Sequence, residues 1–279
     1  MAHHVSPQIP APDMLDPALS DADLAAALVR GAAGIALRMR DIGVSAVEKT
    51  SISDVVTDAD TSAESYVVWQ LRRCRPDDSI LGEEGAAHTG TSGRTWVIDP
   101  VDGTYNFFSG STYWCSALAL TDGAGEDLTD AEVLIGAIFQ PQEDRLWLGG
   151  RDHPATLNGL PIHTETRDDV GQLSAGTYIH PSWLAQPQAA GPWQQAAVLP
   201  ATLRMFGSGS CDLGRVAQAE LGAWFQHSCP AWDWLPGKAI VRAAGGHTAV
   251  VRVNGLDWFV AGPAGAVAQL GAALRFTQP

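Results

Sequence analysis

The nine residues from Trp96 to Thr104 constrain the fold of this chain more than any other segment. They read Trp-Val-Ile-Asp-Pro-Val-Asp-Gly-Thr, so an apolar strand ends on Asp99, Pro100 forces a bend, and Asp102 follows three positions after Asp99. Both carboxylates can then face one point at the end of the strand. Two neighbouring carboxylates repel each other unless a cation lies between them, and Mg²⁺ prefers a few carboxylates together with waters and phosphate oxygens. The segment therefore predicts a metal site, although an ordinary Asp/Gly turn gives the same pattern.

Other residues that could bind a phosphate or a metal lie next to this segment and elsewhere in the sequence. Gly103 and Thr104 begin a turn or a helix, whose backbone N–H groups suit a phosphate. Glu83 and Glu84 end another short strand, and Asp233 follows a tryptophan at the start of a predicted helix. Each observation also has a simpler explanation. Paired glutamates usually face solvent, and an acid in the first turn of a helix complements the helix dipole.

Composition limits the classes of function. The chain has 279 residues, 46% of them hydrophobic, which is enough to bury a sizeable core. Its 17 Lys and Arg against 31 Asp and Glu give a formal charge of -14, which argues against nucleic-acid polymers and anionic membranes as partners. A small phosphorylated substrate stays compatible with this charge, because carboxylates can hold cations that in turn hold phosphate.

The four cysteines and the hydropathy of the chain indicate a cytoplasmic protein. The cysteines are widely spaced and form no C-x-x-C pair, so reduced thiols are expected rather than a zinc site or disulfides. No apolar run is long enough to cross a membrane, and the first residues lack the pattern of a signal peptide. His3 and His4 are assigned no function; they can be a tag remnant or chance.

Helices and strands are expected to alternate irregularly, which favours layered α/β packing without a single repeated βαβ unit. Thr61 and Glu64 suggest a capping box at the start of the second helix, and Asn158-Gly159 a tight turn between residues 145–149 and 160–163. Residues 186–200 read as a surface excursion or a weak helix. Helices are expected over residues 21–40, 60–75, 210–221, 232–243 and 264–274, and strands over 96–99, 114–120, 133–139 and 223–225.

Five segments, in order along the chain, resemble the signatures of the inositol monophosphatase family. Residues 99–107 match D-P-x-D-G-T-x-N-F, residues 82–84 match G-E-E, and residues 232–246 match W-D-x-x-x-G followed by A-G-G. Lys49, Asp54, Val56, Thr57 and Asp60 match K-x₄-D-x-V-T-x-x-D. Residues 158–162 match the N-G-x-P-I hairpin. The matches extend from about residue 20 to residue 275, and together they are highly specific.

The resemblance implies an α/β layered sandwich like that of inositol monophosphatase and fructose-1,6-bisphosphatase, with alternating layers of helices and sheets. It also implies a homodimer and a lithium-sensitive phosphomonoesterase with two or three Mg²⁺ ions per active site. We expect a flexible arm (residues 1–18), a half carrying most metal ligands (19–150) and a half carrying the substrate side and the last metal ligand (151–279).

The resemblance further implies a role for individual residues. Glu83, Thr104 and Asp60 would be catalytic, with Thr104 and Glu83 positioning and deprotonating the attacking water. The implied metal ligands are Glu83, Asp99, the Val101 carbonyl, Asp102 and Asp233. The implied substrate-binding residues are Gly103, Thr104, Gly207, Ser208, Gly209 and Gln226.

Three departures from the family pattern lie on the substrate side. Gln226 stands where inositol-specific members commonly have a glutamate, residues 234–236 are Trp-Leu-Pro instead of small residues, and Gly209 stands where an alanine is common. Inositol monophosphate is the substrate that the resemblance implies. Histidinol phosphate, a sugar phosphate or a phosphoadenosine nucleotide is the alternative within the class, and a non-catalytic metal-dependent regulatory protein is the alternative outside it.

Overall fold

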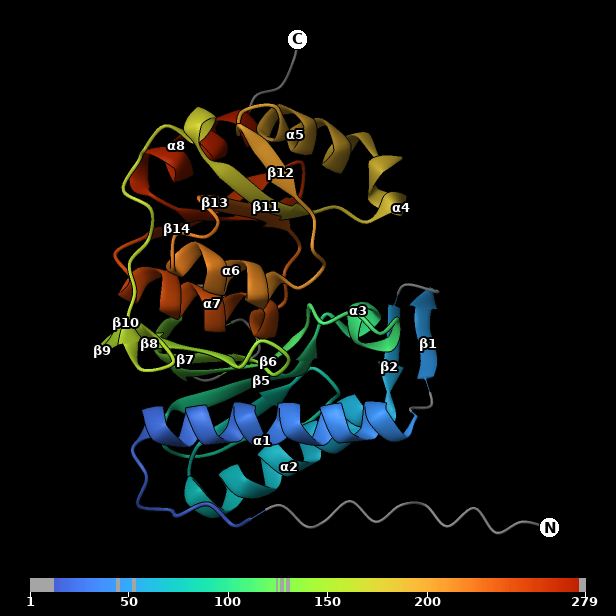
Figure 1. Cartoon of the computed structure of the whole chain (residues 1–279), viewed down its shortest axis with the longest axis vertical. Coiled ribbons are helices and arrows are strands. Elements are labelled where there is room, and N and C mark those ends of the chain that lie inside the picture. Colours follow the sequence, from blue (N-terminus) through green and yellow to red (C-terminus); the bar gives the residue numbers. More distant parts are fainter. Residues whose placement is uncertain are drawn as a thin grey trace, which may run out of the picture.

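The chain folds into alternating layers of helices and sheets (Figure 1), as expected from the sequence. The structure is a computed structural model that describes residues 13–43, 46–51, 54–123, 125, 128 and 131–275, with the backbone alone for residues 46–51 and 54–57. His3 and His4 lie outside the described residues, and so do the side chains of Lys49, Asp54 and Val56-Thr57. Among the described residues, no helix is long and apolar enough to cross a membrane.

The first layer consists of the helices α1 (Asp21–Ile42) and α2 (Asp58–Cys74). Ser20 caps α1 by accepting a hydrogen bond from the Asp23 backbone N at 3.1 Å. The apolar side chains of α1 recur at helical spacing and are buried against α2 and the large sheet. Residues 13–18, expected to be part of a loose arm, are tied to α2 by hydrogen bonds to Gln70.

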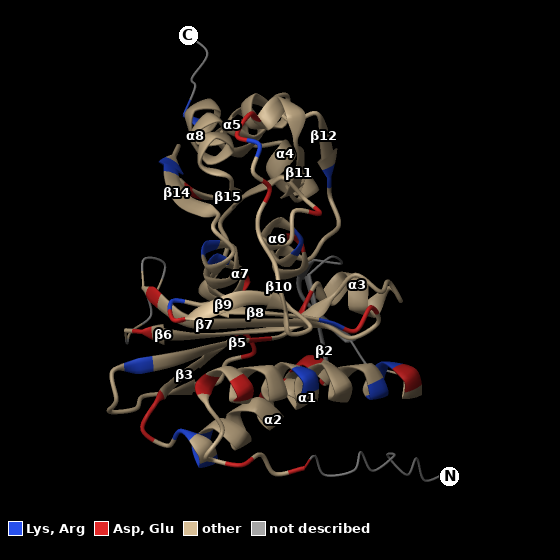
Figure 2. Ribbon diagram, turned by 60° about the vertical axis from the view of Figure 1, so that its left-hand side comes forward, with Lys and Arg blue, Asp and Glu red and all other residues tan. Residues whose placement is uncertain are grey.

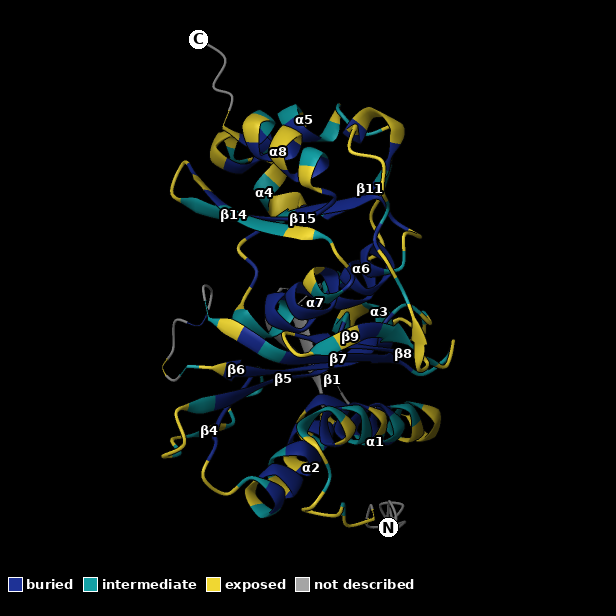
Figure 3. Ribbon diagram, turned by 90° about the vertical axis from the view of Figure 1, so that its left-hand side faces the viewer, coloured by how far each residue is buried: buried dark blue, intermediate teal, exposed yellow. Residues whose placement is uncertain are grey.

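An eight-stranded sheet forms the second layer and is covered on both faces (Figure 3). Strands β3 and β5 run parallel, with Gly82 opposite Ile98, whereas the other neighbours in the sheet run antiparallel. The carboxyl ends of β3 and β5 therefore meet at one edge of the sheet. The strands are β3 (Ser79–Gly82), β4 (Ala87–His88), β5 (Arg94–Asp102), β6 (Cys115–Asp122), β7 (Glu132–Gln140), β8 (Arg145–Gly150), β9 (His153–Leu157) and β10 (Leu160–Pro161).

Helices α6 (Gly209–Ala217) and α7 (Ala231–Ala243) form the middle layer, between the two larger sheets. The sheet approaches α7 so closely that a Cβ on Gly136 would lie 2.3 Å from the Pro236 carbonyl oxygen. The glycine is therefore required for this contact. The large sheet continues past residue 150 through β9 and β10, so residues on both sides of that position contribute strands to it.

A five-stranded sheet in the order β12-β11-β13-β15-β14 forms the fourth layer, and α5 and α8 cover its outer face (Figure 1). The remaining elements are short and lie near the edges of the layers. The bounds are β11 (Ser174–Tyr178), β12 (Thr202–Arg204), β13 (Ala223–His227), β14 (His247–Val253), β15 (Leu256–Gly262), α3 (Thr104–Phe108), α4 (Pro181–Leu184), α5 (Pro187–Ala197), α8 (Ala264–Leu274), β1 (Ala46–Ser51), β2 (Asp54–Thr57) and a 3₁₀ turn (Val170–Gln172).

Two local expectations were wrong. The capping box does not form, because α2 already begins at Asp58 and the Glu64 carboxylate accepts hydrogen bonds from the backbone N atoms of Glu84 and Ala86, at 2.9 and 3.0 Å. The helix expected over residues 210–221 ends at Ala217, because Ala219 adopts a positive φ of 62° that turns the chain toward β13.

The tight turn at Asn158-Gly159 is confirmed, with φ of 51° and 81° at its two residues. It joins β9 to β10, so the partner of the returning strand is β9 rather than residues 145–149. Residues 187–197 form α5, which settles that segment as a helix.

Candidate active site

A cavity of about 740 Å³ opens where the ends of β5, β11 and β13 face the first turns of α3, α6 and α7. Eleven of the expected site residues line it. They are Glu83, Asp99, Val101, Asp102, Gly103, Thr104, Gly207, Ser208, Gly209, Gln226 and Asp233. The twelfth, Asp60, lies behind Thr104 and is fully buried. Figure 2 marks the positions of Asp and Glu in red along the ribbon. The structure thus brings together segments far apart in the sequence.

The parallel pairing of β3 with β5 places Glu83 beside the end of β5. The Glu83 backbone N donates to the Ile98 carbonyl oxygen at 3.1 Å, which continues the strand pairing by one residue. The next turn is held from below, because the buried Glu64 carboxylate binds the backbone N–H groups of Glu84 and Ala86. Glu64 is a positioning residue that the sequence interpretation assigned to a helix cap.

The register of β5 against β6 breaks between Asp99 and Asp102, as expected from the proline between them. Within this bend the Val101 backbone N donates to Asp99 Oδ1 at 3.1 Å. Asp102 Oδ2 accepts hydrogen bonds from Ser208 Oγ at 2.9 Å and from the Ser210 backbone N at 2.6 Å. The start of α6 therefore fixes one oxygen of Asp102 and leaves Asp99 without such support.

The carboxylates at this point repel one another. Burial raises the pKa of Asp99 well above its usual range, and the charges of Glu83, Asp102 and Asp233 raise it further. The pKa of Asp233 is also raised, by loss of contact with water and by Asp102 and Glu83. Hydrogen-bond donors from α6 oppose the effect of burial on the pKa of Asp102 but do not cancel it.

This donor set fits a hard divalent cation. Mg²⁺ prefers oxygen ligands, and a cation between these carboxylates would relieve the repulsion that raises the pKa of Asp99. The backbone carbonyl of Val101 adds a neutral oxygen. Within the described part of the chain, no group of three or more His, Cys, Asp or Glu side chains is already arranged so that it could hold a metal ion.

Thr104 stands at the first position of α3, after Gly103 with a left-handed φ of 89°. Its Oγ1 lies 3.3 Å from Asp60 Oδ1 and 3.1 Å from the Val101 carbonyl oxygen. Asp60 is fully buried, so its carboxylate can hold the hydroxyl without reaching the solvent. The geometry links a cleft-facing hydroxyl to a buried carboxylate.

Asp212 is a fifth acid in the cleft that the sequence interpretation missed. It is 2% exposed, and Tyr113 Oη donates to its Oδ1 at 2.5 Å. Burial raises the pKa of Asp212 to about 8, and the charge of Asp102 contributes to the rise. The only signal in the sequence is an acid between Cys211 and Leu213 on the apolar face of a helix, which is a weak indication on its own.

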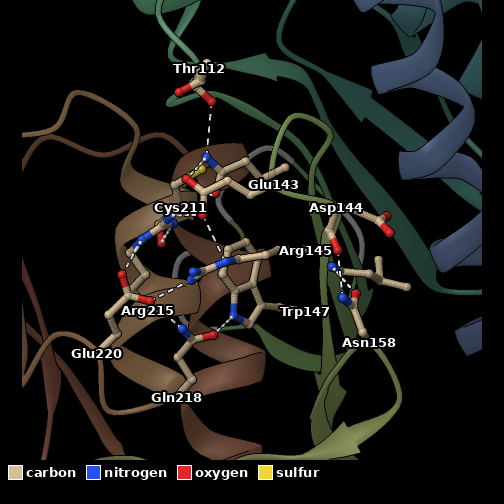
Figure 4. Close-up of polar contacts among 12 residues, drawn as sticks. Thr112, Glu143, Asp144, Arg145, Trp147, Asn158, Cys211, Arg215, Gln218 and Glu220 are labelled. Atoms are coloured by element: carbon tan, nitrogen blue, oxygen red, sulfur yellow. Dashed lines mark hydrogen bonds and ion pairs between the residues drawn. The ribbon is translucent and has the colours of Figure 1, made fainter.

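An ion-pair network fixes α6 against the large sheet (Figure 4). Arg215 is 4% exposed and contacts Glu143 Oε2 at 3.0 Å and Glu220 Oε1 at 3.2 Å. Its guanidinium also lies 4.6 Å from the centre of the Tyr113 ring, which places a cation beside the tyrosine that binds Asp212. The last turn of α6 is thereby anchored to the turn between β7 and β8 and, through Tyr113, lies against the loop before β6.

Two glycines allow the chain segments to approach each other at the cleft. A Cβ on Gly103 would lie 3.1 Å from the Gly207 carbonyl oxygen, and both residues have a positive φ. Asn106 Nδ2 ties the same region by donating to the carbonyl oxygens of Tyr113 at 2.8 Å and Phe206 at 2.7 Å. Asn106, which belongs to the matched motif, thus holds two segments of the cleft wall together.

The cysteines are buried and reduced, as expected. Burial raises the pKa of the Cys115 and Cys229 thiols well above the usual range. Neither is a candidate for a thiolate nucleophile.

Comparison with known proteins finds similarity to a single family. The model of the inositol monophosphatase family matches residues 19–275. The Nus factor SuhB of Xylella fastidiosa is 35% identical over 202 residues, which cover 72% of this chain and 70% of that protein. The histidinol-phosphatase of Mycobacterium tuberculosis is 32% identical over 215 residues, which cover 75% of this chain and 77% of that protein.

Solved structures show the same fold. The extragenic suppressor protein suhB from Bartonella henselae superimposes with a TM-score of 0.78 at 22% identity, over 92% of this chain and 97% of that one. An inositol monophosphatase from Anabaena superimposes with a TM-score of 0.77 at 23% identity, over 92% and 96%.

Proposed function

Because the chain belongs to the inositol monophosphatase family, we propose that it is a Mg²⁺-dependent phosphatase that hydrolyses a small phosphate monoester by direct attack of water. The observation that carries this proposal is the charge of the cleft. Five carboxylates line it, and none of its described lining residues is Lys or Arg. A dianionic phosphate would be repelled there unless cations lay between it and the carboxylates.

Glu83, Asp99, the Val101 carbonyl, Asp102 and Asp233 would hold two or three Mg²⁺ ions. When bound, the ions would supply positive charge to the phosphate and lower the pKa of the attacking water. The lining atoms of Gly103, Gly207, Ser208 and Gly209 would receive the phosphate. The Ser208 hydroxyl already donates to Asp102, so this hydroxyl holds the carboxylate and the other lining atoms of Ser208 would face the phosphate.

The protein groups would manage the proton of the attacking water. Thr104 Oγ1 would take a proton from the water and pass its own proton to Asp60, with which it already shares a hydrogen bond. Glu83 would help Thr104 to position and deprotonate the water. A bond then forms between the water oxygen and phosphorus, the bond from phosphorus to the ester oxygen breaks, and the alcohol takes up a proton from solvent. No protein side chain is phosphorylated.

Removal of divalent cations is expected to abolish hydrolysis without unfolding the protein. In excess chelator, phosphate release should fall at least about 100-fold, because the phosphate would face uncompensated carboxylates. Mg²⁺ should restore the rate, and Li⁺ should inhibit it. The measurement is phosphate release with circular dichroism as a control for folding. Full turnover in chelator would contradict the proposal.

Gln226→Glu is expected to shift preference between substrates without stopping phosphate release. Gln226 lines the cleft at the end of β13. A carboxylate accepts hydrogen bonds from hydroxyls at about 1.5–3 kcal/mol each, against about 0.5–1.5 for a neutral acceptor, so kcat/KM for inositol 1-phosphate should rise about fivefold to tenfold relative to histidinol phosphate. Gln188→Glu on α5, outside the cleft, is the matched control. Equal ratios in all three proteins would remove Gln226 from specificity.

Two finer expectations remain predictions of the sequence. A homodimer and a cytoplasmic location were inferred from the resemblance and from the cysteines. Inositol monophosphate and histidinol phosphate are both represented in the names of the relatives, and the shape of the cleft bears on the choice between such substrates.

A further inference from the structure

We propose that the preferred substrate is the phosphate ester of an alcohol with an aromatic or branched apolar body, rather than a polyol phosphate. The inference rests on the proposed function, since it concerns the leaving group at the same cleft. Three properties of the cleft carry it: large apolar side chains left exposed at one wall, few polar groups free to bind hydroxyls, and a volume well beyond that of a phosphate.

The apolar wall comes from three separate segments. Tyr105 on α3, Leu184 at the end of α4, and Met205 and Phe206 before α6 all line the cleft, and each is between 38% and 49% exposed. Figure 1 shows α3 and α4 on the same side of the molecule. Large apolar side chains exposed together are costly in water unless they serve binding. They surround the same cavity as the carboxylates, so a ligand held there by its phosphate would place its alcohol part against them.

The wall is also held in position. The Phe206 ring lies 4.7 Å from the Tyr113 ring, at an angle of 35°, and Asn106 binds the carbonyl oxygens of both residues. The Tyr113 hydroxyl is in turn fixed by Asp212. A rigid aromatic surface binds a flat or branched apolar group with little loss of side-chain entropy.

The same region offers few partners to a polyol. Asn106 and Ser208 already spend their side-chain donors on protein atoms. Apart from the carboxylates at the metal end of the cleft, the unengaged polar groups of the described lining side chains include the Gln226 amide, the Asn106 Oδ1 acceptor and the hydroxyls of Tyr105 and Tyr178. None of them is charged. A ring with a hydroxyl on every carbon would leave several hydroxyls facing apolar atoms, where an unpaired polar group is unfavourable.

The cavity leaves room for such a body. Its volume of about 740 Å³ lies in the range of sites that enclose drug-sized ligands, about 300–1,000 Å³. Ile179 and Pro181 extend the apolar lining beyond the four exposed side chains. Since no described lining residue is Lys or Arg, nothing on this wall selects for a second anionic group on the substrate.

The test compares esters of alcohols with similar intrinsic reactivity, so that the quality of the leaving group does not decide the result. Methyl phosphate, 2-phenylethyl phosphate, glycerol 2-phosphate and inositol 1-phosphate are assayed with Mg²⁺ on the full chain. We expect kcat/KM for 2-phenylethyl phosphate to exceed that for inositol 1-phosphate at least about tenfold. A preference for inositol 1-phosphate would overturn the inference. If none of the esters were hydrolysed, the proposed function would fail with it.

Variants of the wall distinguish binding from general activity. Leu184→Ala and Met205→Ala should each lower the ratio of kcat/KM for 2-phenylethyl phosphate over methyl phosphate at least about threefold, because each removes apolar contact with the larger ester only. Leu160→Ala is the control, since Leu160 is 71% exposed and lies outside the cleft. Unchanged ratios in both wall variants would overturn the inference. So would a change confined to sedimentation behaviour, which would make the wall an interface between two copies of the chain.

Discussion

Asp99→Asn is expected to remove activity and to stabilise the metal-free protein. Asp99 is 1% exposed and faces the charges of Glu83, Asp102 and Asp233. An amide of the same shape removes the buried charge, which should raise the free energy of unfolding at pH 8 by about 1–3 kcal/mol in chelator. Loss of a metal ligand should lower kcat with Mg²⁺ by about 10²–10⁴-fold.

The raised pKa of Asp99 determines how the difference in stability between the variant and the wild type changes with pH. The pKa of Asp99 is raised in the folded state, so below the unfolded value of about 3.9 both states hold the proton and the carboxyl costs nothing. As the pH rises above that value the unfolded chain ionises first, and the folded wild type loses stability until the pH passes the folded pKa. The gap between variant and wild type should therefore be small near pH 4 and largest at pH 8.

Thermal melts in chelator across this pH range measure the effect. Asp41→Asn is the matched control, because Asp41 is exposed at the end of α1 and should show no such gap. Added Mg²⁺ should stabilise the wild type more than the Asp99 variant, since the cation binds only the folded ligands. A variant that melts below the wild type at pH 8, or that retains full turnover, would show that Asp99 is not part of a crowded metal site.

The local part of the site could be predicted from the sequence because its geometry is local. A strand, a proline and a second acid three residues later fix how Asp99 and Asp102 lie relative to each other. Placing Glu83 beside them needs the parallel pairing of β3 with β5, which no pattern within either strand encodes. The family motifs supplied that information, and the four acids expected as metal ligands do line one cleft.

The parts that could not be predicted depend on contacts between distant segments. Asp212 is an ordinary helical acid in the sequence, and its burial follows from Tyr113, 99 residues away. Arg215 reaches Gln140 and Glu143 across 75 and 72 residues. Glu64 was assigned to a helix cap because S/T-x-x-E is a local pattern, whereas its partners lie 20 and 22 residues further along the chain. Tertiary hydrogen bonds override such local patterns.

The second large effect is expected at Thr104. Its hydroxyl lies 3.3 Å from the buried Asp60 carboxylate, and Thr104 lines the cleft, so the hydroxyl connects the cleft to a carboxylate shielded from solvent. Thr104→Ala removes this connection while leaving the five carboxylates in place. We expect kcat to fall about 10²–10⁴-fold with little change in KM, which is the usual loss when a positioned proton acceptor is removed.

Thr104→Ser separates the hydroxyl from the methyl group and should keep kcat within about tenfold of the wild type. Asp60→Asn tests the other end of the pair, because an amide can still accept the hydrogen bond but cannot take a proton. Its kcat should fall nearly as far as that of Thr104→Ala. The double variant should lose little more activity than either single variant, as expected for two residues that act as one unit. Thr156→Ala in β9, away from the cleft, is the control. Multiplicative losses in the double variant would mean that Thr104 and Asp60 act independently. Proton transfer through the threonine would then be wrong, and Asp60 would serve only to hold the start of α2 against α3.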